Sequence, residues 1–138
     1  MIKSTFQLTF SSELMYAKGV VRQIMFFLNN HFPDMDSDDL FDLKLIMSEL
    51  LYNAVIHGNK SDNSKKVCVE IRLCEDNVCA KISDEGNGFN HSTDLDDECI
   101  GYSENGRGIR LVEALADNMR FTDRGNVVEI YKKVKLNE

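Results

Sequence analysis

Two adjacent segments, in which apolar residues alternate with polar residues or cysteines, constrain this fold more than any other feature. Successive residues of a β-strand point to opposite faces of a sheet, so each segment predicts a strand with one apolar face. The alternating apolar positions are Val67, Val69, Ile71 and Leu73, followed by Val78, Ala80 and Ile82. The short turn Glu75–Asn77 between them predicts an antiparallel hairpin. A sheet built on such a hairpin needs helices on one side only.

Three other segments carry apolar residues at the spacing of an amphipathic helix. The expected helices run from about residue 13 to 30, from Ser37 or Asp38 to Gly58, and from Ile109 to about Asp117. Ser11 or Ser12 is expected to cap the first of them. The remaining strands are expected at residues 6–10, 119–121 and 127–134.

The order of these elements decides between two fold classes. It is strand, helix, helix, two strands, glycine-rich loop, helix, two strands. Strict alternation of strands and helices would favour a parallel doubly wound sheet, and this order lacks it. It predicts an α+β fold, a two-layer sandwich with helices on one face of a mixed, mostly antiparallel sheet. All 138 residues are expected to form one domain.

Composition excludes several classes of protein. The net charge of −7 argues against a broad surface for nucleic acid or anionic membrane. No run of about 18 apolar residues could span a membrane, and the N-terminus lacks the pattern of a secretory signal. The cysteines, at positions 68, 74, 79 and 99, form no C-x-x-C pair, so neither a zinc site nor a disulfide framework is expected. Reduced thiols in a cytoplasmic protein are the expectation.

The second predicted helix ends with a stripe of polar residues. Glu49, Asn53 and His57 recur every fourth residue, beside the positions expected to face the core. Unpaired polar groups are costly there, so they need either internal partners or a ligand. The amide oxygen of Asn53 suits Mg²⁺, and the carboxylate of Glu49 could orient or deprotonate a hydroxyl. His57 is expected to cap carbonyls or to pack.

A first glycine pair follows the hairpin, with Gly86 and Gly88 just after Asp84. Glycine permits a ligand to approach the backbone closely. A carboxylate at this strand end could accept a hydrogen bond from an exocyclic amine such as that of adenine. The alternative is an ordinary turn aspartate beside two turn glycines.

A second glycine pair, Gly106 and Gly108, flanks Arg107 at the start of the third predicted helix. Free N–H groups at the positive end of a helix offer a seat for phosphate, although a simple turn is the alternative. The Walker sequence is absent, and no parallel strand–helix unit surrounds these glycines as a dinucleotide site requires. The acidic segment between the pairs, residues 91–105, is longer than idle loops usually are.

Taken together and in order, three motifs resemble the N box and the two glycine boxes of the GHKL ATP-binding superfamily. They read E-L-L-Y-N-A-V-I-H-G, D-E-G-N-G-F and G-R-G-I-R-L-V. The phrase N-A-V-I-H-G-N and the ending G-N-V-V-E-I-Y-K-K are similar to those of stand-alone bacterial anti-sigma factor serine/threonine kinases. The resemblance extends over nearly the whole chain and implies a Bergerat-type sandwich that binds ATP.

The resemblance also implies roles for individual residues. Glu49 is expected to act as the base on the acceptor hydroxyl, Asn53 to hold Mg²⁺, and Asp84 to bond the adenine amine. A lid is expected at about residues 90–105. The residues expected to contact the nucleotide are Gly86 and Gly88 at the base, and Gly106, Arg107 and Gly108 at the phosphates.

Protein partners follow from the same resemblance. It implies a cytoplasmic homodimer that phosphorylates a small anti-anti-sigma protein of the STAS type and sequesters a sigma factor. One alternative is a nucleotide-binding module that sequesters a regulator with little or no transfer; Glu49 favours the kinase, because a pure binder needs no base. Another is the ATP-binding domain of a sensor histidine kinase, for which a preceding helix pair with a phosphoacceptor histidine is expected. Asn126 departs from the family pattern, since many relatives have threonine there.

Overall fold

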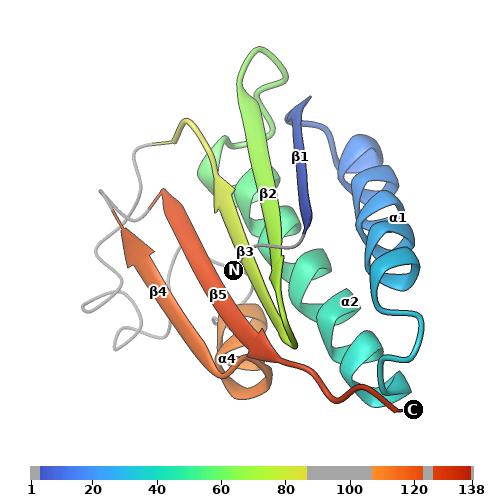
Figure 1. The fold of residues 1–138 in the computed structure, drawn as a ribbon. Helices are drawn as coiled ribbons and strands as arrows, with labels where there is room; N and C mark the ends of the chain where they lie inside the picture. The colour runs from blue at the N-terminus through green and yellow to red at the C-terminus, as the bar shows by residue number, and fades with distance from the viewer. Residues whose placement is uncertain (1–3, 87–106, 123–125, 138) are drawn as a thin grey trace.

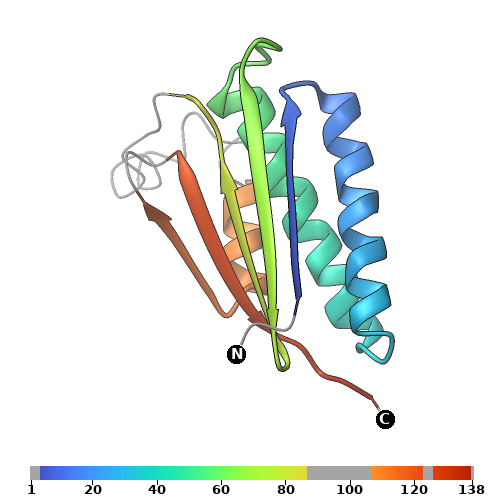
Figure 2. The ribbon, with the colours of Figure 1, turned by 45° about the horizontal axis from the view of Figure 1, so that its top comes forward.

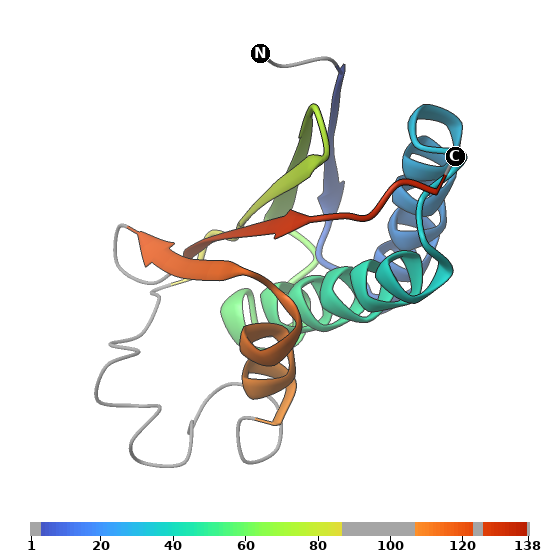
Figure 3. The same ribbon diagram turned by 60° about the horizontal axis from the view of Figure 1, so that its bottom comes forward.

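The computed structural model describes residues 4–86, 107–122 and 126–137, which form one sheet covered by helices on a single face (Figure 1). The elements are β1 (Ser4–Ser11), α1 (Leu14–His31), α2 (Ser37–Asn53), η1 (Ala54–Gly58), β2 (Lys66–Cys74), β3 (Asn77–Ser83), α4 (Arg107–Leu115), β4 (Asn118–Thr122) and β5 (Val127–Lys133). The strands lie in front of α2 and α4 in Figure 2, and the sheet and the helices are seen as two layers in Figure 3. Among the described residues, no helix has the length and apolar character needed to cross a membrane.

The strands of the sheet follow the order β1-β2-β3-β5-β4. Each described pair is antiparallel, and the register aligns Phe6 with Ile71, Ile71 with Ala80, and Ala80 with Ile130. This row of apolar side chains crosses the sheet on its helix-covered face. The α+β sandwich predicted from the alternating segments is confirmed, and the described strand pairs are all antiparallel.

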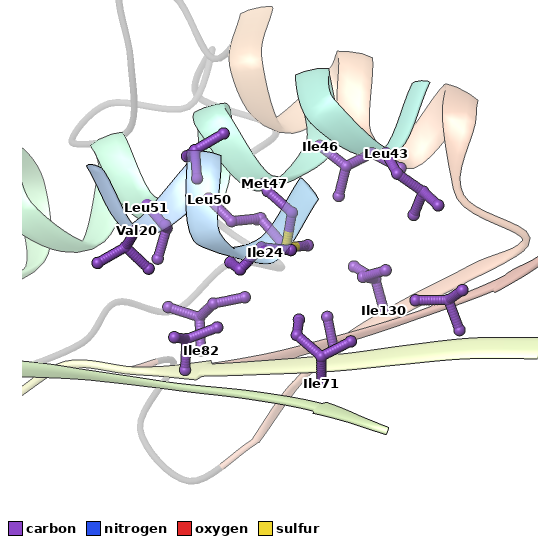
Figure 4. Packing of buried hydrophobic residues seen from close by; sticks show 14 of the residues in the cluster. Val20, Ile24, Leu43, Ile46, Met47, Leu50, Leu51, Ile71, Ile82 and Ile130 are labelled. Carbon is purple, nitrogen blue, oxygen red and sulfur yellow. The ribbon is translucent and has the colours of Figure 1, made fainter. Parts of the chain in front are cut away.

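The core lies between this face and the helices, and α2 occupies its centre. Ile46 and Leu50 of α2 point toward Ile82 and Ile71 of the hairpin, with Ile24 of α1 beside them (Figure 4). Each is at most 2% exposed. Burying one such side chain contributes about 1.5–3 kcal/mol, so the core holds α2 firmly against the sheet. The polar residues at the end of α2 are therefore carried on a rigid element.

The polar face of the hairpin carries the cysteines and a small charge network. Cys68, Cys74 and Cys79 are partly buried free thiols, as the composition predicts, and Cys99 lies outside the described residues. The polar face continues onto β5, where the carboxylate of Glu129 accepts hydrogen bonds from the guanidinium group of Arg120 at 2.7–2.8 Å.

The start of α1 differs from the expectation. Glu13 occupies the N-cap position and its side chain makes no capping hydrogen bond. Ser12 does not cap the helix, because its Oγ is buried and accepts a hydrogen bond from Nδ2 of Asn59 at 2.6 Å. The hydroxyl of Ser11 donates to the carbonyl of Asn63 instead of a helical N–H group. Both serines join the start of α1 to the segment after η1.

The end of α2 also differs from the expectation of one continuous helix. The α-helix ends at Asn53, and η1 is a single π-helical turn in which the N–H group of Asn59 donates to the carbonyl of Ala54 at 2.9 Å. A π-turn has more residues per turn than an α-helix, so the four-residue stripe does not continue regularly to His57. Glu49 and Asn53 remain one α-helical turn apart.

Candidate functional site

A small pocket lies where the C-terminal end of α2 meets the ends of β3 and β5. Its lining includes Leu50, Asn53, Asp84, Ile109, Phe121 and Asn126. These residues come from α2, from the segments that flank β3 and β5, from the first turn of α4 and from β4. The fold thus brings Asn53 and Asp84, which the sequence analysis singled out separately, to one site.

Asn53 is the most unusual residue of the pocket. It is 2% exposed, and among the described residues neither its Nδ2 nor its Oδ1 has a hydrogen-bond partner. An amide buried in this way costs about 1–3 kcal/mol. The cost is consistent with a ligand that supplies the missing partners. Its Oδ1 is a hard oxygen atom of the kind that Mg²⁺ binds.

Asp84 is held in place by the strand beside it. Its N–H group donates to the carbonyl of Asn126 at 3.0 Å, and Nδ2 of Asn126 donates back to the Asp84 carbonyl at 3.2 Å. The carboxylate accepts a hydrogen bond from the N–H group of Gly86 at 2.8 Å. Burial raises the pKa of Asp84 to about 6, and the Gly86 N–H group and the charge of Lys65 oppose the rise only in part. This desolvated carboxylate is suited to accept a hydrogen bond from a ligand.

Asn126 borders the same pocket, at the position where the family resemblance leads one to expect threonine. Its Oδ1 is buried and has no hydrogen-bond partner among the described residues. The pocket therefore contains two orphaned amide oxygens, those of Asn53 and Asn126, in addition to the carboxylate of Asp84. Its polar atoms are mainly acceptors, which suits a ligand that presents amine hydrogens or a cation.

Two glycines pack directly against Asp84. A Cβ atom on Gly58 would lie 2.2 Å from Oδ2 of Asp84, and a Cβ atom on Gly86 would lie 2.0 Å from the Gly58 carbonyl oxygen. Neither position can hold a larger residue without a shift of the backbone or of the Asp84 carboxylate. The sequence around Gly58 predicts only the end of a helix and does not reveal the contact with Asp84.

Asn59 is a second residue whose importance the sequence analysis missed. It is fully buried, and its Nδ2 donates to Oγ of Ser12 at 2.6 Å and to the carbonyl of Lys66 at 2.8 Å. Its Oδ1 accepts a hydrogen bond from the N–H group of Glu85 at 2.7 Å. One amide thus joins the start of α1, the start of β2 and the segment that carries Asp84. The only sequence signal was an amide residue directly after Gly58.

Glu49 does not line this pocket. It is partly buried one turn before Asn53, in a groove between α1 and α2 that also contains Lys18, Arg22 and Lys44. The structure thus divides the predicted stripe: Asn53 lines the pocket, and Glu49 lines the groove between α1 and α2. A hydroxyl group carried by another molecule could approach Glu49 from the groove side.

His57 has the surroundings of a packing residue. Its ring lies edge-on to that of Tyr52, with ring centroids 6.1 Å apart. The pKa of His57 is lowered, chiefly by burial and also by the nearby charge of Lys60, so the ring is neutral at pH 7. These surroundings agree with the structural role expected for it.

The first turn of α4 borders the pocket through Ile109, with Gly108 buried beside it. The positive end of the α4 dipole therefore lies at the pocket edge. Gly88, Gly106 and the lid expected at about residues 90–105 lie outside the described residues, as does the side chain of Arg107.

Comparison with known proteins shows the family of this chain. Residues 10–132 match the model of the histidine kinase-like ATPase domain. An anti-sigma F factor of Clostridium perfringens is 28% identical over 109 residues, which cover 75% of this chain and 78% of the relative. The serine-protein kinase RsbW of Staphylococcus aureus is 30% identical over 108 residues, covering 71% of this chain and 68% of the relative.

A solved structure shares the fold. It contains the RsbU and RsbW domains of a Mycobacterium tuberculosis protein, with a TM-score of 0.66 at 21% identity. The alignment covers 96% of this chain and 33% of that longer one, and at this identity it speaks for the fold alone. Because the family match covers most of the sequence, this chain belongs to the histidine kinase-like ATPase domain family.

Proposed function

We propose that this protein is an ATP-dependent protein-serine/threonine kinase of a bacterial partner-switching system, in which it also acts as an anti-sigma factor. One observation carries the proposal: a pocket that joins the unpartnered amide of Asn53 to the desolvated carboxylate of Asp84. The names of the two relatives, anti-sigma F factor and serine-protein kinase RsbW, support the biological role.

The adenine of ATP is proposed to lie against Asp84, whose carboxylate accepts a hydrogen bond from the exocyclic amine. Gly86 and Gly88 are proposed to leave room for the base. The phosphates are then directed to the start of α4, where Gly106, Arg107 and Gly108 can contact them at the positive end of the helix dipole. The −7 charge of the chain opposes phosphate at long range, so local N–H groups and a cation are needed.

Asn53 is proposed to bind Mg²⁺ through Oδ1. Among the described residues no group of three acidic, histidine or cysteine side chains could hold a metal ion. That suits Mg²⁺, which uses few protein ligands and fills its coordination shell with water and phosphate oxygens. Bound there, the ion would offset the negative charge of the phosphates.

Glu49 is proposed to act as the general base. It accepts the proton of a serine or threonine hydroxyl while that oxygen forms a bond to the γ-phosphorus of ATP. The bond from the γ-phosphorus to the bridging oxygen breaks, and ADP leaves with the electron pair. The groove between α1 and α2 leaves Glu49 open to a hydroxyl group on a second protein.

The acceptor is proposed to be a small anti-anti-sigma protein of the STAS type, and the sequestered partner a sigma factor. The protein is proposed to act as a homodimer in the cytoplasm without direct contact to nucleic acid. These assignments rest on the names of the relatives and on the family resemblance.

Phosphate transfer tests this function directly. The protein is incubated with Mg-ATP and a STAS-type protein from the same genome, and phosphoserine or phosphothreonine is sought by mass spectrometry. We expect transfer that requires Mg²⁺ and is not supported by GTP. If millimolar Mg-ATP does not bind, the proposal is wrong.

A second candidate function is a module that binds nucleotide and sequesters a regulator without transfer. The position of Glu49 in the groove, outside the pocket of Asn53, is the observation that favours it. Tight ATP binding without transfer to any STAS-type protein of the genome would decide for this second function.

A further inference from the structure

Lys132 is a charged residue on the apolar face of the sheet. Along β5, Val128 and Ile130 face the core, and Lys132 follows on the same face. It is 7% exposed, whereas its neighbour Lys133 is exposed on the other face. A buried ammonium group is costly unless it has close partners, so its partners show what the position requires.

The ammonium group of Lys132 joins two helix ends. Its Nζ donates to the carbonyl of Leu115, the last residue of α4, at 2.8 Å. It also lies 3.8 Å from Oδ1 of Asp39 and 3.8 Å from Oδ2 of Asp42, in the first turns of α2. The cation thus sits between the negative end of the α4 dipole and the acidic residues at the start of α2.

These helix ends are the ones remote from the nucleotide pocket. Asp42 and Asn53 are eleven residues apart on α2, which corresponds to roughly 16 Å along the helix axis. Leu115 and Gly108 are seven residues apart on α4, roughly 10 Å. Both helices lie side by side on the same face of the sheet (Figure 3). Lys132 therefore ties α2 and α4 together at one end, while their other ends border the pocket.

We propose that Lys132 is a positioning residue for the phosphate half of the nucleotide site. By fixing the end of α4 to the start of α2, it sets the distance between the first turn of α4 and Asn53. The base half depends less on it, because Asp84 is held by hydrogen bonds to Asn126 and Gly86. This inference rests on the proposed ATP site.

Nucleotide binding by three variants tests the proposal. Lys132→Met keeps the length of the side chain without its charge, Lys132→Arg keeps the charge, and Lys133→Met removes an exposed charge on the other face of β5 as a matched control. The dissociation constants of Mg-ATP and adenosine are measured for each folded protein. We expect Lys132→Met to weaken the binding of Mg-ATP about tenfold and the binding of adenosine less than about twofold. The two effects differ by about 1 kcal/mol of binding free energy. Lys132→Arg should recover most of the loss, and Lys133→Met should change neither constant.

A milder variant covers the case in which Lys132→Met does not fold. Asp42→Asn removes one carboxylate but leaves the hydrogen bond from Lys132 to the carbonyl of Leu115. We expect it to weaken the binding of Mg-ATP about threefold and to leave the binding of adenosine unchanged. Equal losses for ATP and adenosine, or unchanged ATP affinity in the folded variants, would overturn the positioning role alone. Wild-type protein that binds adenosine but not Mg-ATP would instead overturn the proposed function.

Discussion

One buried and one partly buried polar side chain define the site at the scale of single residues. Asn53 has no partner among the described residues, and Asp84 accepts a hydrogen bond from a backbone N–H group. Natural proteins accept such costs at functional positions, where stability and function compete. Each residue therefore predicts opposite effects on stability and on ligand binding.

Replacing Asn53 with leucine should separate the two effects. Asn53→Leu keeps the branched shape of the side chain, fills part of the pocket and removes the unpaired amide, so the free energy of unfolding should rise by about 1 kcal/mol. Binding of Mg-ATP should be lost. Urea denaturation and titration calorimetry measure the two quantities. A destabilised variant, or one that binds Mg-ATP as the wild type does, would contradict the role given to this amide.

Asp84 makes base binding depend on pH. Its carboxylate must be charged to accept a hydrogen bond from the adenine amine, and burial raises its pKa to about 6 in the free protein. Adenosine affinity should therefore fall about fourfold between pH 7.5 and 5.5. Adenosine is the probe because it has no phosphate to titrate. In Asp84→Asn the affinity should be lower and independent of pH over this range.

The same shift predicts the opposite trend for stability. The folded protein binds a proton at Asp84 more tightly than the unfolded chain does, so this residue favours the fold more as the pH falls from about 6 toward 3.8. At pH 8 the charged carboxylate lowers the free energy of unfolding by about 1 kcal/mol after solvent screening. Asp84→Asn should remove that penalty. If Asp84→Asn has a lower free energy of unfolding than the wild type at pH 8, the raised pKa given to Asp84 is contradicted.

At the scale of elements, the site depends on how closely η1 approaches the segment after β3. Gly58 and Gly86 let two backbones and the Asp84 carboxylate come within van der Waals contact, and Asn59 joins the same segments through its amide. A π-turn at the end of α2 accompanies this approach, and such turns are frequent at functional sites.

Substitution of two glycines tests the close approach. Gly58→Ala should lower the free energy of unfolding by about 2 kcal/mol and weaken the binding of adenosine, because the new Cβ would meet the Asp84 carboxylate. Gly19→Ala is the matched control: it lies in α1 with no atom within 4 Å of the new Cβ. That control should raise stability by about 0.5–1 kcal/mol and leave binding unchanged. Thermal unfolding and adenosine titration compare the two variants.

The fold could be predicted largely from local patterns. The alternation around Val69 and Ala80 predicted the hairpin correctly, because one buried face produces a period of two in the sequence. The cap of α1 could not be predicted, since Ser12 is engaged by Asn59, which is distant in sequence. The π-turn depends on the same tertiary contacts and leaves no period in the sequence.

At the scale of the whole molecule, the site is assembled from segments that no local pattern connects. Asn53 and Asp84 could be linked beforehand only through the resemblance of the ordered motifs to a known family. The separation of Glu49 into the groove between α1 and α2 was not predicted, because it depends on how α1 packs beside α2. The role of Lys132 could not be predicted either. Its charge interrupts an otherwise apolar strand face, and the sequence does not show which groups lie beside it.

The division between pocket and groove separates the proposed nucleotide site from the proposed acceptor site, and a change at Glu49 tests that division. In the proposed function the pocket binds ATP, and the acceptor hydroxyl reaches Glu49 through the groove. Binding and transfer should therefore respond separately to a change at this residue. Glu70→Gln, on the polar face of β2, is the matched control for loss of one carboxylate.

The most direct measurement compares ATP affinity and the rate of phosphate transfer in Glu49→Gln, Glu70→Gln and wild-type protein. For Glu49→Gln we expect the dissociation constant of Mg-ATP to stay within about twofold and the single-turnover transfer rate to fall at least about 100-fold. Glu70→Gln should match the wild type in both. Phosphate transfer at the wild-type rate by Glu49→Gln would contradict the proposed role of Glu49 as the general base.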